Sequence, residues 1–215
     1  MPKFIDEIQL FTDYYDPFFS RNFSFEIGIE LVKKDMKITI VDGSPDSYSN
    51  RDFTLHLAEG LIDAGHRVKL LKTDKMKINY CQGCWSCWWK TPGECPQKDD
   101  MPEFYKSYLD SDIVVHFSPL SMGFISSRLK TINDRTVPLV HPYIQIVNKE
   151  CHHQKRYEKY PWLALIVDQM DGDTEDLKIT KDLYSRLAIN LKSELKVFST
   201  TKKSKEELID ELSHI

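Results

Sequence analysis

Long apolar runs and a targeting signal are both missing from this sequence of 215 residues. No stretch approaches the roughly 20 apolar residues that a helix needs to cross a bilayer. The first residues, MPKFIDEIQLFTDYYDPFF, are acidic and aromatic, whereas a secretory signal begins with a basic segment followed by an apolar one. We therefore expect a cytoplasmic protein with no membrane partner.

Cysteine, net charge and nucleotide-binding motifs are also scarce. The five cysteines are too few and too unevenly placed for a disulfide scaffold. A formal net charge of −4 gives no bias towards nucleic acid. Neither the Walker loop nor Gly-x-Gly-x-x-Gly occurs, which argues against ATP and against a Rossmann-type NAD site. The length fits one main domain with a sizeable core.

What the sequence does contain is an alternation of short apolar runs with amphipathic segments. Helices are predicted from apolar spacing around 51–65, 124–136 and 204–212, and a further helix runs through Leu183 and Leu187. The predicted strands are 37–42, 67–72, 112–119, 162–168 and 195–200. Such an alternation predicts an α/β fold, a flavodoxin-like three-layer sandwich with a five-stranded parallel sheet of order 2-1-3-4-5.

Two segments fall outside this pattern. The loop at 73–100 is too long for a simple connection between a strand and a helix, and loops of that size are usually functional. Residues 1–36 form an N-terminal extension before the main domain at 37–215. Within the extension, apolar residues alternate over 23–31 as in a half-buried strand, which favours either an added edge strand or a subunit contact.

The loop at 43–51, GSPDSYSNR, follows the first predicted strand. Gly43 permits a sharp turn, the Ser and Asn side chains are hydrogen-bond donors, and the N–H groups of the following helix add positive potential. Such a loop can hold a phosphate without a cationic side chain. An ordinary polar turn that caps a helix explains the same residues.

Ligands of open parallel sheets bind beyond the carboxyl ends of the strands. Three predicted loops meet there, at 43–51, 118–124 and 168–173. In the second of them Pro119 fixes the chain and Gly123 permits close approach, so its backbone can follow the edge of a planar ring. The cysteine-rich loop leaves the second strand at the same end of the sheet and should border the same cleft.

Taken in order, the segments GSPDSYSN, CQGCWSCWWKTPGECPQKDDM and SPLSMGFISSRLKTINDR resemble the NADPH-dependent FMN reductase-like and iron–sulfur flavoprotein family. The resemblance covers roughly residues 37–200. It implies a flavodoxin-like fold, bound FMN, and reduction of a flavin, quinone or related acceptor by NAD(P)H. It also implies a homodimer or homotetramer with the flavin close to a subunit boundary.

The resemblance assigns roles to residues of this chain. The implied ligands of the FMN phosphate are Ser44, Ser49 and Asn50, and Arg51 would compensate the unusual Asp46. Along the isoalloxazine it places Pro119, Leu120, Ser121, Met122 and Gly123. Ser121 stands where the family often has an aromatic residue, so Trp85 or Met122 would cover the ring instead. The remaining expected cofactor contacts are Gln82 and Asp168.

Four cysteines lie within 15 residues, at Cys81, Cys84, Cys87 and Cys95. In the iron–sulfur flavoproteins a compact run of this type ligates a 4Fe–4S cluster. Alternatives are a flavin-lining loop with thiols buried as small apolar groups, a zinc site, or a redox dithiol. The nearest cations along the chain are Lys90 and Lys98, and neighbouring acids disfavour thiolates. Of these acids, Asp99 and Asp100 are expected to begin a helix.

A second constellation, ECHHQKRYEKYPW at 150–162, is expected to be a polar loop. A metal site is disfavoured there, because adjacent histidines on a loop rarely converge on one ion. A position at the rim of the site is favoured instead, in which Lys155, Arg156 and Tyr157 receive the phosphates of the nicotinamide or contact a subunit. Arg128 and Arg135 are expected on a helix surface or in salt bridges.

These observations favour an FMN-dependent NAD(P)H oxidoreductase. No catalytic side chain is named, because the chemistry belongs to the cofactor. One alternative is a non-enzymatic electron carrier that holds FMN and a 4Fe–4S cluster and transfers electrons to a protein. Another is a flavin-binding sensor or regulatory module whose N-terminal extension contacts a partner.

Overall fold

The computed structural model describes residues 35–50, 52–147, 149–169 and 174–215. The alternating segment at 23–31 and the proposed phosphate-compensating Arg51 lie outside these residues, so both remain predictions.

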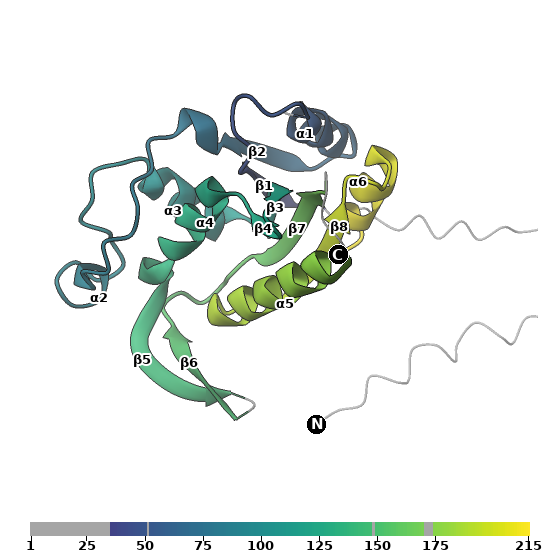
Figure 1. Cartoon of the computed structure of the whole chain (residues 1–215). Coiled ribbons are helices and arrows are strands. Elements are labelled where there is room, and N and C mark those ends of the chain that lie inside the picture. Colours follow the sequence, from purple (N-terminus) through teal and green to yellow (C-terminus); the bar gives the residue numbers. More distant parts are fainter. Residues whose placement is uncertain (1–34, 51, 148, 170–173) are drawn as a thin grey trace, which may run out of the picture. The chain divides into compact units, whose positions relative to one another are not determined.

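A central sheet of five parallel strands has the order β2-β1-β3-β7-β8, with the small β4 paired antiparallel to β3 (Figure 1). Its parallel strands are β1 (Lys37–Asp42), β2 (Arg67–Lys72), β3 (Ile113–Ser121), β7 (Trp162–Asp168) and β8 (Leu195–Thr200). The sequence IVVHFSPL of β3 is buried throughout, as expected for a strand covered on both faces. The predicted strand order and fold class are confirmed.

Helices cover both faces of the sheet and divide the core into two apolar clusters. On one face, α1 (Phe53–Asp63) and α6 (Lys205–Ser213) pack Leu57, Leu61 and Leu208 against Ile38 and Ile40. On the other face lie α3 (Met101–Asp110), α4 (Ser127–Asp134) and α5 (Thr174–Asn190). The three-layer arrangement is therefore present, and Figure 1 shows the sheet between the two groups of helices.

The helix predicted at 124–136 begins later than the spacing of apolar residues suggested. Phe124 and Ile125 form β4, which pairs with the end of β3, and Ser126 caps α4 by accepting a hydrogen bond from Leu129 N. Two residues in the left-handed region, Met122 (φ 51°) and Gly123 (φ 77°), connect β3 to β4. The turn therefore keeps the chain in the sheet for two residues before the helix can start.

Residues 140–155 contradict the first part, 150–155, of the polar loop predicted at 150–162. They form an antiparallel hairpin of β5 (Val140–Val147) and β6 (Glu150–Lys155), which projects from the face that carries α5 (Figure 1). The strand ECHHQK has no apolar run, so period and composition gave no strand signal there. Short elements complete the described fold: the helix α2 (Ser86–Trp89) and the 3-10 turns η1 (Thr73–Lys75) and η2 (Val137–Leu139). No helix within the described ranges is both long and apolar enough to traverse a bilayer.

A buried polar network crosses the core between β3, α4 and α5. His116 is 1% exposed, and its Nδ1 lies 3.2 Å from the hydroxyl of Tyr184, which accepts a hydrogen bond from Asn133 Nδ2 at 3.1 Å. Burial lowers the pKa of His116 to about 4. The imidazole therefore stays neutral in the folded protein well below the pH at which it protonates in the unfolded chain.

This difference predicts acid-sensitive stability. Because the unfolded histidine titrates near pH 6.5, stability from the neutral His116 is complete above that pH and is lost as the pH falls towards 4. The loss amounts to about 2 kcal/mol between about pH 7.5 and about pH 5. Urea unfolding of His116→Gln should show a pH dependence smaller by that amount. The control His56→Gln, on the exposed face of α1, should keep the dependence of the parent; equal curves for all three proteins would refute the assignment.

Candidate functional site

The loop after β1 is held by a buried carboxylate. Asp42 accepts hydrogen bonds from Ser44 N (2.9 Å), from the Ser44 hydroxyl (2.5 Å) and from the Thr54 hydroxyl (2.7 Å). Ser44 is itself buried, so both of its donors point into the protein. This predicted phosphate ligand therefore fixes the loop to the start of α1 in the structure.

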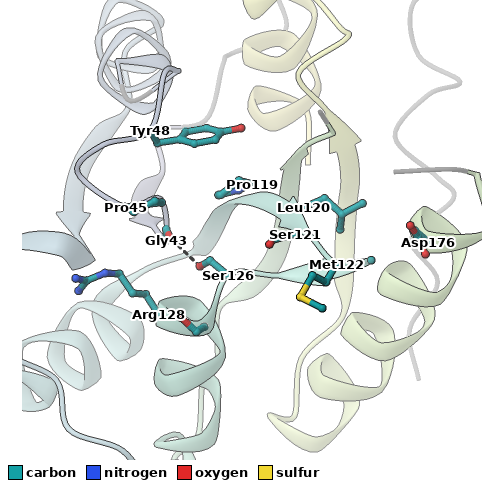
Figure 2. Close-up of a pocket in the computed structure, with 12 residues that line it drawn as sticks. Gly43, Pro45, Tyr48, Pro119, Leu120, Ser121, Met122, Ser126, Arg128 and Asp176 are labelled. Atoms are coloured by element: carbon teal, nitrogen blue, oxygen red, sulfur yellow. Dashed lines mark hydrogen bonds between the residues drawn. The ribbon is translucent and has the colours of Figure 1, made fainter. Parts of the chain in front are cut away.

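Gly43 joins this loop to the start of α4. Its N–H donates to Phe117 O at 2.8 Å, and its carbonyl accepts from the Ser126 hydroxyl at 2.6 Å (Figure 2). A Cβ at Gly43 would lie 2.8 Å from Leu129 Cβ and 3.0 Å from Phe117 O. Only glycine permits this approach without displacing the backbone of β3 or the helix.

The third predicted loop is brought to the first one by Asp168 at the end of β7. Its carboxylate accepts from Asn50 Nδ2 at 2.9 Å and from the Thr201 hydroxyl at 2.6 Å. Burial and the Asp168 carboxylate raise the pKa of Tyr48 well above its ordinary value, so this phenol stays protonated. Two predicted site residues, Asn50 and Asp168, thus contact each other directly.

A cavity of about 740 Å³ lies at this end of the sheet (Figure 2). Its volume is within the range of sites that hold small molecules and cofactors. The lining residues come from the β1–α1 loop, the β3–β4 turn, the start of α4 and α5: Gly43, Pro45, Tyr48, Pro119, Leu120, Ser121, Met122, Gly123, Ser126, Ser127, Arg128 and Asp176. All five residues predicted from 119–123 are among them.

Other predicted contacts do not line this cavity. Ser44 is buried, Ser49 and Asn50 follow the lining residue Tyr48 in the β1–α1 loop, and Gln82 and Trp85 belong to the cysteine-rich loop. A smaller cavity of about 240 Å³ shares Ser127 and Arg128 with the main one and is lined by Tyr80, just before the first cysteine. The first residues of the cysteine-rich loop therefore border the smaller cavity, next to the main one. The cofactor roles of Gln82 and Trp85 stay predictions.

Met122 has an unusual conformation for a residue with a side chain. Its φ of 51° is in the left-handed region, and its side chain is fully exposed at the cavity. The adjacent Gly123 has φ 77°, and a Cβ there would lie 2.8 Å from Asp176 Oδ1. The turn thus presents a thioether at a backbone position that glycine would occupy at lower energy.

The neck of the cysteine-rich loop is closed by a buried ion pair. Arg135 Nη1 donates to Asp99 Oδ2 at 2.7 Å and to Asn79 O at 2.7 Å, and the two side chains are 2% and 0% exposed. Burial opposes ionisation of Asp99, but hydrogen bonds from Arg135, Asn79 N and Met101 N hold its pKa below the ordinary value. Arg135 thus forms a salt bridge, one of the two roles predicted for it, but the pair is buried and does not lie on the helix surface.

The tip of the same loop packs on the hairpin. The ring of Trp88 stacks on Trp85, with centroids 4.9 Å apart, and lies tilted against His153 of β6 at 4.7 Å. Its Nε1 donates to the carbonyl of Val140 at 3.0 Å. Arg156 donates to the carbonyls of Pro138 (2.9 Å) and Val140 (3.2 Å). The predicted rim residue Arg156 braces this junction with its guanidinium and does not line the cavity, whereas the alternative prediction of a subunit contact stays a prediction.

All four thiols of the loop are free. Cys81 and Cys84 are exposed, Cys95 is half-buried and Cys87 is buried. Burial, followed by the nearby thiols of Cys95, Cys84 and Cys81, raises the pKa of Cys87 to about 11. The donors suit iron or zinc chemically and lie near one another. Within the described part of the chain, however, no three His, Cys, Asp or Glu side chains are arranged to hold a metal ion.

The buried pair gives a stability prediction. Asp99→Asn leaves the Arg135 charge buried without its carboxylate, so the free energy of unfolding should fall by about 3–5 kcal/mol. Asp134→Asn breaks an exposed pair with Lys130 on the same side of the fold and should cost less than about 1 kcal/mol. Denaturant unfolding of both variants measures the difference. Similar small losses would mean that the neck is not held by this pair.

Comparison with known proteins agrees with this geometry. The sequence model of NADPH-dependent FMN reductase matches residues 36–156. An iron–sulfur flavoprotein of Archaeoglobus fulgidus is 37% identical over 107 residues, which cover 49% of this chain and 48% of that protein. An iron–sulfur flavoprotein of Methanocaldococcus jannaschii is 30% identical over 105 residues, which cover 48% of this chain and 53% of that protein. The matched part of the chain spans about half the length of these curated relatives.

Among solved structures, the NAD(P)H:quinone oxidoreductase from Methanothermobacter marburgensis superposes with a TM-score of 0.52 at 18% identity. The superposition covers 82% of this chain and 94% of that one, and at this identity it establishes the fold alone. The family match is stronger evidence, because it covers more than half of the chain and includes the β1–α1 loop, the cysteine-rich loop and the β3–β4 turn. On this evidence the chain belongs to the NADPH-dependent FMN reductase family.

Proposed function

We propose that the protein is an FMN-dependent NAD(P)H oxidoreductase that reduces a flavin, quinone or similar acceptor. The observation that carries the proposal is the cavity of about 740 Å³, which joins the β1–α1 loop to the β3–β4 turn in a chain of this family. Bound FMN would supply the redox chemistry, by accepting a hydride from the nicotinamide and passing electrons to the acceptor. The protein supplies binding, orientation and exclusion of water. The acceptor, the homodimer or homotetramer and the cytoplasmic location stay predictions.

The β1–α1 loop would hold the phosphate of FMN. The N-terminus of α1 provides N–H groups and a positive dipole end, and Ser49 and Asn50 lie in the loop before it. Ser44 supports this loop through Asp42, so its direct contact with a phosphate stays a prediction. Asp46 forms an ion pair with Lys75 at 3.0 Å and is exposed, which reduces its repulsion of a bound phosphate.

The β3–β4 turn would hold the ring. Pro119, Leu120 and Met122 offer apolar contacts, and the backbone of Ser121 and Gly123 can reach the polar edge of a planar group. The phenol of Tyr48, which stays protonated, lines the opposite wall. These residues fit a flat, partly polar cofactor without requiring a titrating side chain.

The second candidate is an electron-transfer flavoprotein that holds FMN and a 4Fe–4S cluster. It is favoured by the four free thiols within one loop, which lie close enough for Cys95 and Cys84 to raise the pKa of Cys87. Cys81, Cys84, Cys87 and Cys95 would have to converge further on binding the cluster. The two candidates differ in whether the protein itself oxidises NAD(P)H.

An anaerobic preparation of the full chain tests both candidates. We expect a flavin absorption spectrum after FMN is added, and oxidation of NADPH or NADH when a quinone or free flavin is present. Iron and sulfide analysis of the same sample reports the cluster. A protein that stays colourless after addition of FMN would refute the proposal. Bound FMN and iron without any NAD(P)H oxidation would favour the electron carrier.

The conformation of Met122 predicts opposite effects of one substitution on stability and on FMN binding. Met122→Gly relieves the left-handed backbone, so the free energy of unfolding should change little or rise by up to about 1 kcal/mol. Because the thioether contact is lost, FMN binding should weaken several-fold. The control is Lys192→Gly, because Lys192 has φ 59° in the turn after α5 and does not line the cavity.

Thermal melts and fluorescence titration with FMN separate the two effects. Lys192→Gly should leave FMN affinity unchanged. If Met122→Gly binds FMN as tightly as the parent, the thioether does not contact the ring.

A further inference from the structure

A second, smaller cavity lies beside the main one and has a different chemical character. It has a volume of about 240 Å³ and is lined by Thr73, Ile78, Tyr80, Ser127, Arg128 and Thr131. Four of these side chains carry hydroxyl groups, one is a guanidinium and none is a carboxylate. The space is ample for a phosphate group, since one water occupies about 30 Å³. Its lining therefore offers hydrogen-bond donors and a positive charge to a small anion.

Arg128 stands between the two cavities and lines both. Its Nη1 donates to the carbonyl of Thr73 at 3.2 Å, which fixes one edge of the guanidinium and leaves further N–H donors. Among the residues that the structure describes, no carboxylate forms an ion pair with Arg128. Figure 2 shows this side chain at the opposite end of the main cavity from Asp176, the acid among the lining residues.

The start of α4 adds a second source of positive potential. Ser126 caps the helix, Leu129 N donates to its hydroxyl and Lys130 N to its carbonyl. The N–H groups of Ser127 and Arg128 precede these and have no partner within the helix. They lie in the first turn of an eight-residue helix, next to the guanidinium. Side chain and backbone therefore converge on the same space.

The cations expected at the rim of the site, Lys155 and Arg156, line neither of these two cavities. Arg156 donates hydrogen bonds to the carbonyls of Pro138 and Val140. Arg135 donates to the carboxylate of Asp99 and to the carbonyl of Asn79. Within the lining of the two cavities, Arg128 is the cationic side chain. A dinucleotide whose nicotinamide enters the main cavity carries two or three phosphate groups that must lie outside the apolar part of it.

We propose that the cavity of Thr73, Tyr80, Ser127 and Arg128 is a phosphate subsite for the nicotinamide dinucleotide, with Arg128 as the residue that selects it. This inference rests on the proposed function, since it assumes that the main cavity holds the reacting rings. A guanidinium can bind phosphate with two parallel hydrogen bonds, and the Tyr80 and Ser127 hydroxyls can complete the contact. The phosphate bound is either the pyrophosphate, common to NADH and NADPH, or the 2′-phosphate of NADPH.

The test compares Arg128→Ala with Lys130→Ala in the FMN-loaded full chain. Both variants remove one positive charge from an exposed side chain of α4, but Lys130 pairs with Asp134 and lines neither cavity. For Arg128→Ala we expect KM for the dinucleotide to rise about tenfold or more with kcat nearly unchanged, because a charge-assisted hydrogen bond is lost on binding. Lys130→Ala should match the parent.

Two further readouts do not depend on turnover. Calorimetric titration with NADP⁺ and NAD⁺ should show the same weakening in Arg128→Ala, and raised salt should weaken the parent more than the variant. Arg128→Lys keeps the charge without the planar fork and should recover part of the affinity. An effect on both dinucleotides identifies the pyrophosphate as the bound group, whereas an effect on NADP⁺ and NADPH alone identifies the 2′-phosphate.

The outcomes distinguish this inference from the proposed function. If the parent binds FMN and oxidises NAD(P)H but Arg128→Ala has unchanged KM and unchanged dinucleotide affinity, the subsite is refuted and the function stands. If Arg128→Ala loses FMN instead, Arg128 serves the flavin and the subsite is again refuted. If the parent neither binds FMN nor oxidises NAD(P)H, the proposed function fails and the subsite fails with it.

Discussion

The close approach of the β1–α1 loop to the start of α4 is the constraint on which the candidate site depends. Gly43 donates to Phe117 O of β3 and accepts from Ser126 of α4, in a space where a Cβ does not fit. This contact fixes two chain segments, one suited to a phosphate and one suited to a ring, at a defined separation. The buried Asp42 carboxylate fixes the loop by accepting hydrogen bonds from Ser44 and Thr54. The cavity is therefore built from backbone positions that the sheet itself sets.

A second, separate set of contacts holds the cysteine-rich loop in place. The ion pair of Asp99 and Arg135 fixes its neck. At its tip, Trp88 contacts Trp85 of the same loop and His153 of the hairpin. A single buried ion pair contributes little net stability against an apolar replacement, but removing one partner is costly. The arrangement therefore favours a defined loop position more than a stable core. A loop that holds four closely spaced thiols near the main cavity requires such a defined position.

The sheet, its order and the loops that meet at its carboxyl edge could be predicted from the sequence, because buried parallel strands appear as apolar runs between helices of regular spacing. The residues of 119–123 could be predicted for the same reason, since they directly follow the strand β3. The hairpin β5–β6 is only partly visible in the sequence, because VHPYIQIV of β5 is rich in β-branched and aromatic residues whereas ECHHQK of β6 has no apolar period. For Arg135 the sequence indicates a helix surface or a salt bridge, but not the partner or the burial, because Asp99 lies 36 residues away. For Arg128 it indicates the same two roles; its position between two cavities depends on the late start of α4.

That late start links the two cavities. Because Phe124 and Ile125 extend the sheet as β4, the first turn of α4 is displaced to the rim, where Ser127 and Arg128 face both spaces. If the helix began at 124, as its apolar spacing suggested, these two residues would lie a turn further into it and their N–H groups would be used within the helix. The short β4 strand therefore exposes a helix terminus and a guanidinium at the same point. The left-handed turn at Met122 and Gly123 makes β4 possible, so one strained turn shapes the wall of the main cavity and the entrance to the smaller one.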